Sequence, residues 1–433
     1  MKILNLHIEQ FRHLENLDFD FTYQSGDRRG QTLDKICFIG QSATGKTGLL
    51  ELVYEHITNI TNLELIDNKY LAGLDNPVKN INGEINILFG NEVLGLRNKQ
   101  IIFKGEKYKF ENKGGTVTPL IPYQDQNDLF YFKANLISDK NIDIFTKSPI
   151  DLFEQYYSDT NFSLKKIRQN KIDLTEFSTI FNDEVDTKIW ISFIEDILEY
   201  RKNFTQKMSE LIHKGLLADT KKLSLEFQKW QKENPNSLEI FAKKLNPLLE
   251  KLNLEVDLVN TEYSVPIKNK RTDEIIPVQN TSTGTKGLLL SFLPLFKLDT
   301  KDSIILIDEP ERSLYPDMQM DLMDHYQNLA PEAQFIVATH SPFIAASFEP
   351  DERFILYFDE DGKVAVRRGS SPIGDDPNDM LKNDFGVNYY NKHGEEAYQK
   401  YITLKQEVAN ENDPKRKKEL LLETVKLGDT YNF

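Results

Sequence analysis

Cysteine is almost absent from this sequence of 433 residues, which contains only Cys37, inside an apolar run. A single cysteine excludes a disulfide framework and any metal site built from cysteine alone, and Cys37 is most simply a core residue. Histidine is also scarce, and the seven histidines are spread without the spacing of paired metal ligands. No apolar stretch approaches the roughly 18 residues of a membrane span, and no signal-peptide apolar core follows Met1. We therefore expect a cytoplasmic protein without membrane contacts.

Positive charge is in deficit, because 53 Lys and Arg residues face 68 Asp and Glu residues, which gives a net charge of −15. This balance excludes a protein whose whole surface attracts nucleic acid, although a local basic groove stays open. Hydrophobic residues make up 39% of the chain and aromatic residues 11%, which excludes a disordered chain. The length allows two to three domains, or one domain with large insertions.

The order of apolar patterns predicts an α/β fold with a mixed sheet. Alternating and fully apolar runs predict strands near the N-terminus, and Gly and Asn pairs between residues 84 and 110 predict antiparallel hairpins. A later stretch has apolar residues every three to four positions and predicts helices that Pro235 and Pro247 interrupt. The four predicted regions are an N-terminal lobe with an antiparallel β-subdomain (1–148), a helical insertion (149–258), a second α/β lobe (259–370) and a charged helical tail (371–433).

The strongest local signal is a run that fits the pattern G-x-x-x-x-G-K-[ST]. Its residues are Gly40, Gln41, Ser42, Ala43, Thr44, Gly45, Lys46 and Thr47. The two glycines permit backbone conformations that turn N–H groups toward a phosphate, Lys46 can reach the β- and γ-phosphates, and Thr47 can supply a hydroxyl to Mg²⁺. An apolar run precedes the loop and an amphipathic helix pattern follows it, so a helix N-terminus would add positive potential. The alternative is a plain glycine-rich turn.

A second signal is the apolar run 304–307, which ends in Asp308 and Glu309. The carboxyl end of a buried strand is where ligands of open α/β sheets bind. Here Asp308 would hold Mg²⁺, and Glu309 would polarise the attacking water. The alternative is a charged pair that caps a strand for solubility.

Two further elements fit a nucleotide site. Ser282, Gly284, Thr285 and Lys286 lie at the start of a predicted helix, and we expect them to form a second phosphate clamp. The alternative there is an ordinary helix N-cap formed by Thr281 or Ser282. His340 ends the strand after Glu309, where it could contact the γ-phosphate, although a lone histidine is usually structural.

In this order, the four elements resemble the ABC-type ATPases, in the soluble branch that includes SMC proteins and RecF. The resemblance assigns 40–47 to the Walker A motif, 282–286 to the signature motif, 304–309 to the Walker B motif and His340 to the switch histidine. The stretch from Glu309 to Pro316 is similar to that branch's E-P-E-x-x-L-H-P stretch, with Tyr315 where histidine is common.

The resemblance implies a P-loop NTPase fold of the ABC-ATPase type that hydrolyses ATP with Glu309, Lys46 and His340. Mg²⁺ would be held by Thr47, Asp308 and the Q-loop glutamine, for which Gln124 or Gln126 is the candidate. The segment that ends at Arg12 is similar to the branch's opening strand, which would place Arg12 near the nucleotide. The signature of one subunit would complete the ATP site of another, which implies a homodimer or a multiple of dimers.

Within this branch, the compact size, the signature and the segment 377–387 look most like bacterial AAA-family ATPases of anti-phage and restriction-associated systems, such as the Septu and PARIS ATPase subunits. That likeness implies an ATP-dimerised regulator or sensor that controls a separately encoded nuclease. The alternatives are a RecF-like DNA-binding clamp in repair and a scaffold without DNA binding. The degenerate signature disfavours a transporter subunit.

A nuclease centre in the chain itself is not predicted, because the only downstream acidic group, 359–361, falls in a turn. DNA is a possible partner through three Lys-rich stretches, 165–168, 268–271 and 415–418. The alternative for these stretches is a solvated surface balanced by nearby acids.

Overall fold

The computed structural model describes residues 1–61, 82–97, 100–103, 106–109, 129–146, 178–185, 187–387, 392–431 and 433. The strands are β1 (Lys2–Phe11), β2 (Leu14–Asp20), β3 (Lys35–Gly40), β4 (Asn82–Phe89), β5 (Glu92–Arg97), β6 (Gln100–Phe103), β7 (Glu106–Lys109), β8 (Leu129–Phe132), β9 (Ser178–Phe181), β10 (Leu254–Val256), β11 (Ile267–Asn269), β12 (Ile275–Ile276), β13 (Ile304–Asp308), β14 (Gln334–Ala338), β15 (Arg353–Phe358) and β16 (Val364–Arg368). The helices are α1 (Lys46–Thr61), α2 (Asp139–Thr146), α5 (Thr187–His213), α6 (Thr220–Glu233), α7 (Ser237–Glu250), α8 (Thr283–Lys297), α9 (Pro316–Met320), α10 (Leu322–Leu329), α11 (Pro342–Ala345), α12 (Pro377–Asn383), α13 (Lys392–Asn410) and α14 (Pro414–Tyr431).

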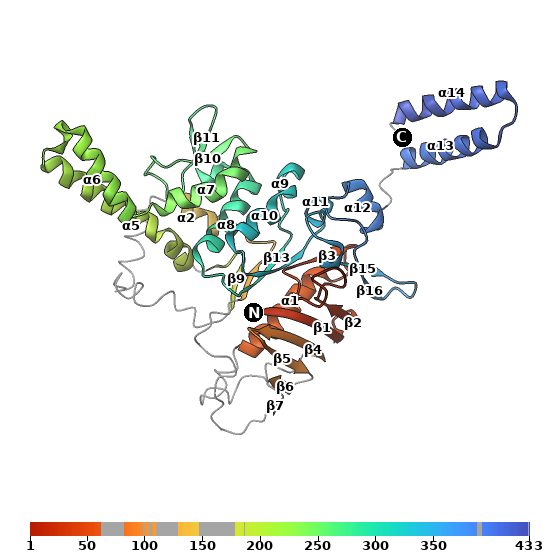
Figure 1. Ribbon diagram of the computed structural model, residues 1–433, viewed down its shortest axis with the longest axis horizontal. Helices are drawn as coiled ribbons and strands as arrows, with labels where there is room; N and C mark the ends of the chain where they lie inside the picture. Colours follow the sequence, from red (N-terminus) through yellow and green to blue (C-terminus); the bar gives the residue numbers. More distant parts are fainter. Residues whose placement is uncertain are drawn as a thin grey trace.

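A central sheet with the strand order β16-β15-β3-β14-β13-β8-β9 carries the body (Figure 1). All its neighbouring strands are parallel except β15 and β16, which form an antiparallel hairpin. A second sheet, with the order β2-β1-β4-β5-β6-β7, is antiparallel throughout. The predicted mixed α/β sheet with an antiparallel β-subdomain is therefore confirmed.

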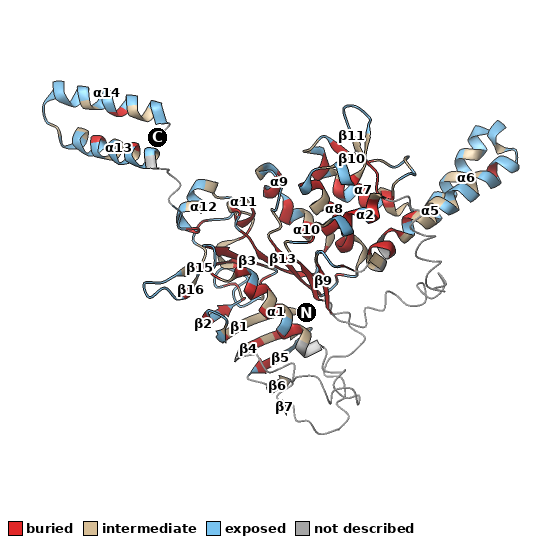
Figure 2. Cartoon of the chain, turned by 180° about the vertical axis from the view of Figure 1, so that it is seen from behind, coloured by how far each residue is buried: buried red, intermediate tan, exposed pale blue. Residues whose placement is uncertain are grey.

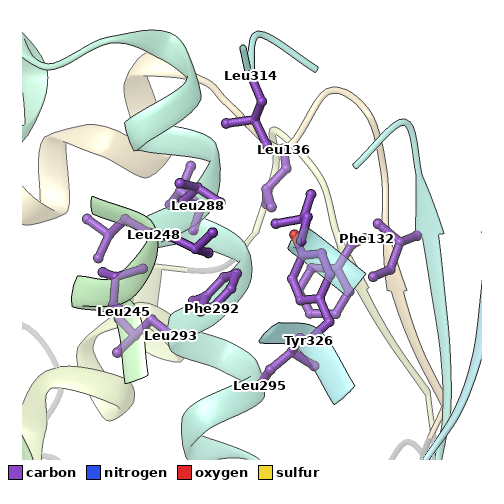
Figure 3. Packing of buried hydrophobic residues seen from close by; sticks show 14 of the residues in the cluster. Phe132, Leu136, Leu245, Leu248, Leu288, Phe292, Leu293, Leu295, Leu314 and Tyr326 are labelled. Carbon is purple, nitrogen blue, oxygen red and sulfur yellow. The ribbon is translucent and has the colours of Figure 1, made fainter. Parts of the chain in front are cut away.

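Side chains alternate across the central sheet and enter two separate cores, as the period of a strand requires. In β3, Ile36 and Phe38 pack in the core that holds α1 and the antiparallel sheet, whereas Cys37 and Ile39 pack in the core that holds α8. Figure 3 shows part of the second core, in which Phe292 of α8 lies among other large apolar side chains. Helices α1 and α8 thus cover opposite faces of one sheet, and Cys37 is the buried core residue that its sequence context predicts.

The region predicted as a helical insertion contains α5, α6 and α7, but it is not wholly helical. Strand β9 lies within it and pairs in parallel with β8 at the edge of the central sheet. Pro235 separates α6 from α7 as expected, whereas the prediction that Pro247 ends a helix is wrong, because Pro247 lies inside α7. Burial of Leu248 and Leu249 after the proline keeps that last turn packed on the core and offsets the lost backbone hydrogen bond.

Two helical hairpins project from opposite ends of the body (Figure 1). One consists of the distal part of α5 with α6, and the other consists of α13 with α14. Most of their surface is exposed in Figure 2, and α6 has no buried residue. The predicted helical tail is thereby confirmed as α12, α13 and α14, while the predicted domain boundaries stay predictions. Among the described residues, no helix is long and apolar enough to cross a membrane.

Candidate functional site

The phosphate loop, residues 40–47, connects β3 to α1 and begins and ends its turn on glycines with positive φ. Gly40 has φ 134° and Gly45 has φ 91°. A Cβ on Gly40 would stand 1.9 Å from the carbonyl oxygen of Leu356 in β15, so only glycine fits there. The loop is held between β15 and α1, and its backbone N–H groups can face an anion at the N-terminus of α1.

Lys46 is the buried cation of this loop. Its ammonium donates hydrogen bonds to the carbonyl oxygens of Gly40 at 3.0 Å and Gln41 at 2.8 Å. Burial lowers the pKa of Lys46 to about 8, against the opposing pull of the carboxylates of Asp308 and Glu309. The ammonium is therefore poorly solvated and gains from contact with a polyanion such as a triphosphate.

Asp308 ends β13 beside the loop, two strands away from β3 in the parallel part of the sheet. Its Oδ1 accepts a hydrogen bond from the Thr47 hydroxyl at 3.1 Å. Burial raises the pKa of Asp308 to about 6, which the hydrogen bond from Thr47 partly counteracts. A hydroxyl and a carboxylate are oxygen ligands of the kind that Mg²⁺ prefers. Among the described residues no group of three His, Cys, Asp or Glu side chains gathers to hold a metal.

Glu309 follows Asp308 with an unusual backbone conformation. Its φ is 51°, and its N–H donates to the carbonyl oxygen of Ala338 in β14 at 2.9 Å. A left-handed conformation in a residue other than glycine is uncommon and is often found at functional sites. The carboxylate lies close enough to Lys46 and His340 to counteract in part the lowering of their pKa values by burial.

His340 lies just beyond the end of β14 and is exposed, and its backbone N–H donates to Oε1 of Glu311 at 2.8 Å. Partial burial and the Lys46 ammonium lower the pKa of His340. Glu311 thus fixes the position of the histidine, a role that sequence reasoning missed although the residue was part of the recognised stretch. The structure brings Lys46, Asp308, Glu309 and His340 together at one edge of the sheet.

Arg12 lies beside the start of α1, close to Gly48, and its predicted place near the nucleotide stays a prediction. It occupies the β1–β2 turn with φ 55°, and its guanidinium pairs with Glu51 of α1 at 2.8 Å. Sequence reasoning missed its neighbour His13, whose ring lies so close to Gly45 that a Cβ there would meet its Nε2 at 3.1 Å. The only signal for His13 is its place in the turn directly after Arg12. Gln124 and Gln126, the candidate Q-loop residues, lie outside the described residues.

The signature residues form the N-terminus of α8 on the other face of the sheet. Ser282 is the N-cap, and its Oγ accepts from the backbone N–H of Thr285 at 3.1 Å and contacts the Thr285 hydroxyl at 2.9 Å. Gly284 packs so tightly that a Cβ would stand 2.5 Å from the carbonyl oxygen of Ser313. The cap interpretation is confirmed, and Lys286 lies in the first turns of the same helix. The phosphate contacts predicted for this loop stay a prediction.

A cavity of about 50 Å³ lies between the ends of β8 and β13 and helix α8. Phe132, Leu288 and Leu314 contribute to its wall (Figure 3). Glu309 and Gly284 also border it. The carboxylate edge and the signature helix of one copy therefore border the same cavity.

The basic stretch 268–271 is balanced by acids. Lys268 pairs with Glu255 at 3.0 Å and with Asp273 at 3.3 Å, and Lys270 pairs with Glu250 at 2.7 Å. These pairs are what the solvated-surface alternative expects, and a contact of this stretch with DNA stays a prediction. The stretch 165–168 lies outside the described residues.

A phosphate loop after one parallel strand, with an acidic pair at the end of another, defines a P-loop nucleoside triphosphatase. The profile of the AAA ATPase domain family matches residues 1–345, and the chain belongs to this family. The protein is accordingly an ATPase.

Two curated relatives are similar to this chain. The Retron Ec83 probable ATPase of Escherichia coli is 21% identical over 398 residues, which cover 82% of this chain and 71% of that protein. The Septu protein PtuA of Bacillus thuringiensis is 35% identical over 72 residues, which cover 17% of this chain and 18% of PtuA.

Solved structures of SMC head domains also align with the chain. The Smc head domain with an extended coiled coil from Pyrococcus furiosus, bound to the C-terminal domain of ScpA, aligns with 85% of this chain and 96% of its own, at 15% identity and a TM-score of 0.37. The SMC head domain from Thermotoga maritima aligns with 86% of this chain and 100% of its own, at 12% identity and a TM-score of 0.36.

Proposed function

We propose that this ATPase works as a pair of copies in which the phosphate loop of one copy and the signature loop of the other enclose each ATP. The observation that carries the proposal is the placement of the two loops. Helix α1 and helix α8 pack in different cores on opposite faces of the central sheet. Each face of the sheet therefore carries one helix N-terminus that can bind phosphate. Two copies that face one another would bring one N-terminus of each kind to the same ATP.

Each residue of the site has a definite task in this arrangement. Lys46 moves from the carbonyl oxygens of its own loop to the β- and γ-phosphate oxygens, and Arg12 adds positive charge beside the loop. Thr47 and Asp308 would hold Mg²⁺, and when bound this ion would supply positive charge against the negative charge of the phosphates. Ser282 and the N-terminus of α8 bind the γ-phosphate from the second copy.

Hydrolysis then depends on Glu309. Its carboxylate accepts a proton from a water molecule while the water oxygen bonds to the γ-phosphorus and the bond to the β-phosphate oxygen breaks, with its electron pair passing to ADP. Lys46 and His340 stabilise the negative charge on the transferred group. Loss of the γ-phosphate removes the shared ligand, so the two copies separate and their grip on a partner changes.

In the cell, the switch would serve an anti-phage system as a regulator of a separately encoded nuclease. The resemblance of the sequence to the ATPases of such systems supports this role, and so does the similarity to relatives named for a retron and for Septu. DNA-stimulated turnover by the isolated protein would instead favour the repair-clamp alternative. Stable co-purification with a nuclease from the adjacent reading frame would favour the regulator.

The split site can be tested by complementation between two inactive variants. Lys46→Ala destroys the phosphate loop but keeps the signature, and Gly284→Ala distorts the signature but keeps the phosphate loop. The two chains are co-expressed with different affinity tags and purified on both, so that every pair is mixed. One intact site remains in each mixed pair, and we expect about half of the wild-type turnover per pair.

The matched control combines Lys46→Ala with Asp308→Asn, because both lesions lie in the phosphate-loop half and no intact site can form. No turnover is expected from that combination. If the first mixed pair is as inactive as the control, although both chains are folded and paired, the shared site is wrong.

A further inference from the structure

The helical hairpin formed by α13 and α14 is too thinly packed to be a complete structural unit. Among its described residues only Ala397, Leu404 and Thr424 are buried. Two helices alone seldom bury enough apolar surface to stay folded in water, and helical tertiary structure depends on a packed apolar face. In Figure 1 the hairpin lies away from the ATPase body.

One face of α14 exposes large apolar side chains. Leu421 is 51% exposed, Leu422 60% and Val425 52%. A groove of about 400 Å³ between α13 and α14 is lined in part by two of these side chains, Leu421 and Val425, and by Val408 of α13. Apolar side chains gathered in this way typically mark an interaction surface.

Charged residues continue this apolar stripe at both ends. Lys418, Leu422, Val425 and Asp429 are spaced at i, i+4, i+7 and i+11, so they lie along one side of the helix. Neither Lys418 nor Asp429 has an ion-pair partner within the described part of the chain. The order along the stripe is cation, apolar, apolar, anion.

Both charges also oppose the dipole of their own helix. A helix N-terminus favours anions and a C-terminus favours cations, yet the first turn of α14 has no acidic residue and its last turn has no basic one. Four basic residues, 415–418, occupy the N-terminal end instead. Helix α13 already lies antiparallel to α14 within the hairpin. An antiparallel α14 of a second copy would add a further helix whose favourable end lies beside each of the two charges.

From these features we propose that α14 docks antiparallel on α14 of a second copy, so that the two hairpins form a four-helix bundle that does not require ATP. A two-fold axis midway between residues 423 and 424 places Lys418 opposite Asp429 of the other copy. The same register places Leu422 opposite Val425 of the other copy. Both pairings occur twice, as a self-complementary two-fold interface requires. A single register of the two helices forms the charged pair and the apolar pair together.

The bundle would hold two ATPase bodies together before nucleotide binds. Closure around ATP would then occur within a tethered pair, and it would no longer depend on the total concentration of the protein. This proposal adds to the shared ATP site, but it does not depend on it, because the docking surface lies on α14 alone.

A charge exchange tests the register directly. The full-length protein is studied in EDTA without nucleotide, and its mass is measured by sedimentation equilibrium over a range of concentrations. Wild type should dimerise. Lys418→Asp should weaken the dimer at least about tenfold, because two Asp pairs then face each other, and Asp429→Lys should do the same. The double variant Lys418→Asp/Asp429→Lys restores opposite charges and should return the dimer constant to within about threefold of wild type.

Two further variants complete the test. Leu422→Glu should give a monomer, because it places a charge at the apolar centre of the interface. Lys382→Asp is the matched control, because Lys382 is exposed, carries the same charge as Lys418 and lies in α12, outside the hairpin. It should leave the dimer unchanged. A wild-type monomer under these conditions, a Leu422→Glu dimer, or a double variant as weak as the single ones would each overturn the proposal. The complementation experiment on ATP turnover would be unaffected by such a result, so the two proposals can fail separately.

Discussion

The phosphate loop and the signature loop both present the N-terminus of a helix, but they are stabilised by different interactions. The phosphate loop holds buried charge, with Lys46 5% exposed and Asp308 8% exposed. The signature loop is held by a neutral Ser282 cap and by the close approach of Gly284 to the backbone of Ser313. The first loop therefore acts through its charged groups, in binding and in chemistry, whereas the second depends on close steric packing.

This difference predicts that the two loops respond differently to loss of a lysine. Lys46→Ala removes a buried ammonium that would otherwise bind two phosphates, so ATP affinity should fall by at least about 100-fold. Lys286→Ala removes a lysine of the signature helix and should leave ATP affinity unchanged within about threefold. Calorimetric titration of nucleotide into each protein measures both. Equal losses in the two variants would contradict the division of labour between the loops.

A second prediction concerns α1, the helix that follows the phosphate loop. His56 of α1 is 2% exposed, and its Nδ1 lies 2.8 Å from the carbonyl oxygen of Leu52. Burial lowers the pKa of His56 to about 4, below its usual value of about 6.5. Between these two values the unfolded chain binds more protons than the folded one, so this residue makes the protein less stable as the pH falls from 6.5 toward 4.

The expected loss from His56 is about 3 kcal/mol of unfolding free energy between pH 7 and pH 4. His56→Leu should remove that part of the pH dependence, which urea unfolding at several pH values measures. His213 is exposed at the end of α5, and His213→Leu should keep the wild-type slope. Parallel curves for wild type and His56→Leu would show that burial of His56 does not affect the acid stability of the phosphate-loop face.

The sequence was informative wherever a function depends on neighbouring residues. The phosphate loop and the acidic end of β13 are contiguous patterns with fixed chemistry, so their positions could be predicted. Strand β9 was missed because its four residues, 178–181, lie in a region dominated by helical periodicity. Its partner β8 is remote in sequence, and only the sheet reveals the pairing.

Contacts between distant residues could not be predicted from the pattern. Glu311 positions the backbone of His340 across 29 residues, and no spacing rule connects a loop carboxylate to the end of the next strand. The placement of the signature on the opposite face of the sheet also needed the structure, because a helix N-cap has the same local sequence on either face. Sequence thus identified the chemical groups, and the topology determined which of them meet.

The smallest expected effect is on ATP turnover, when a side chain is added in the tightly packed signature loop. Gly284→Ala places a Cβ against backbone, 2.5 Å from the Ser313 carbonyl oxygen, and should displace the start of α8. ATP affinity should stay near wild type, because the phosphate loop is untouched, while turnover falls at least about tenfold. Gly287→Ala is the matched control, because its Cβ would meet only the flexible end of Ile137 at 3.1 Å. Steady-state ATPase assays with parallel binding titrations separate the two quantities. A Gly284→Ala protein that binds and hydrolyses ATP like wild type would show that the shape of this loop is not needed for turnover.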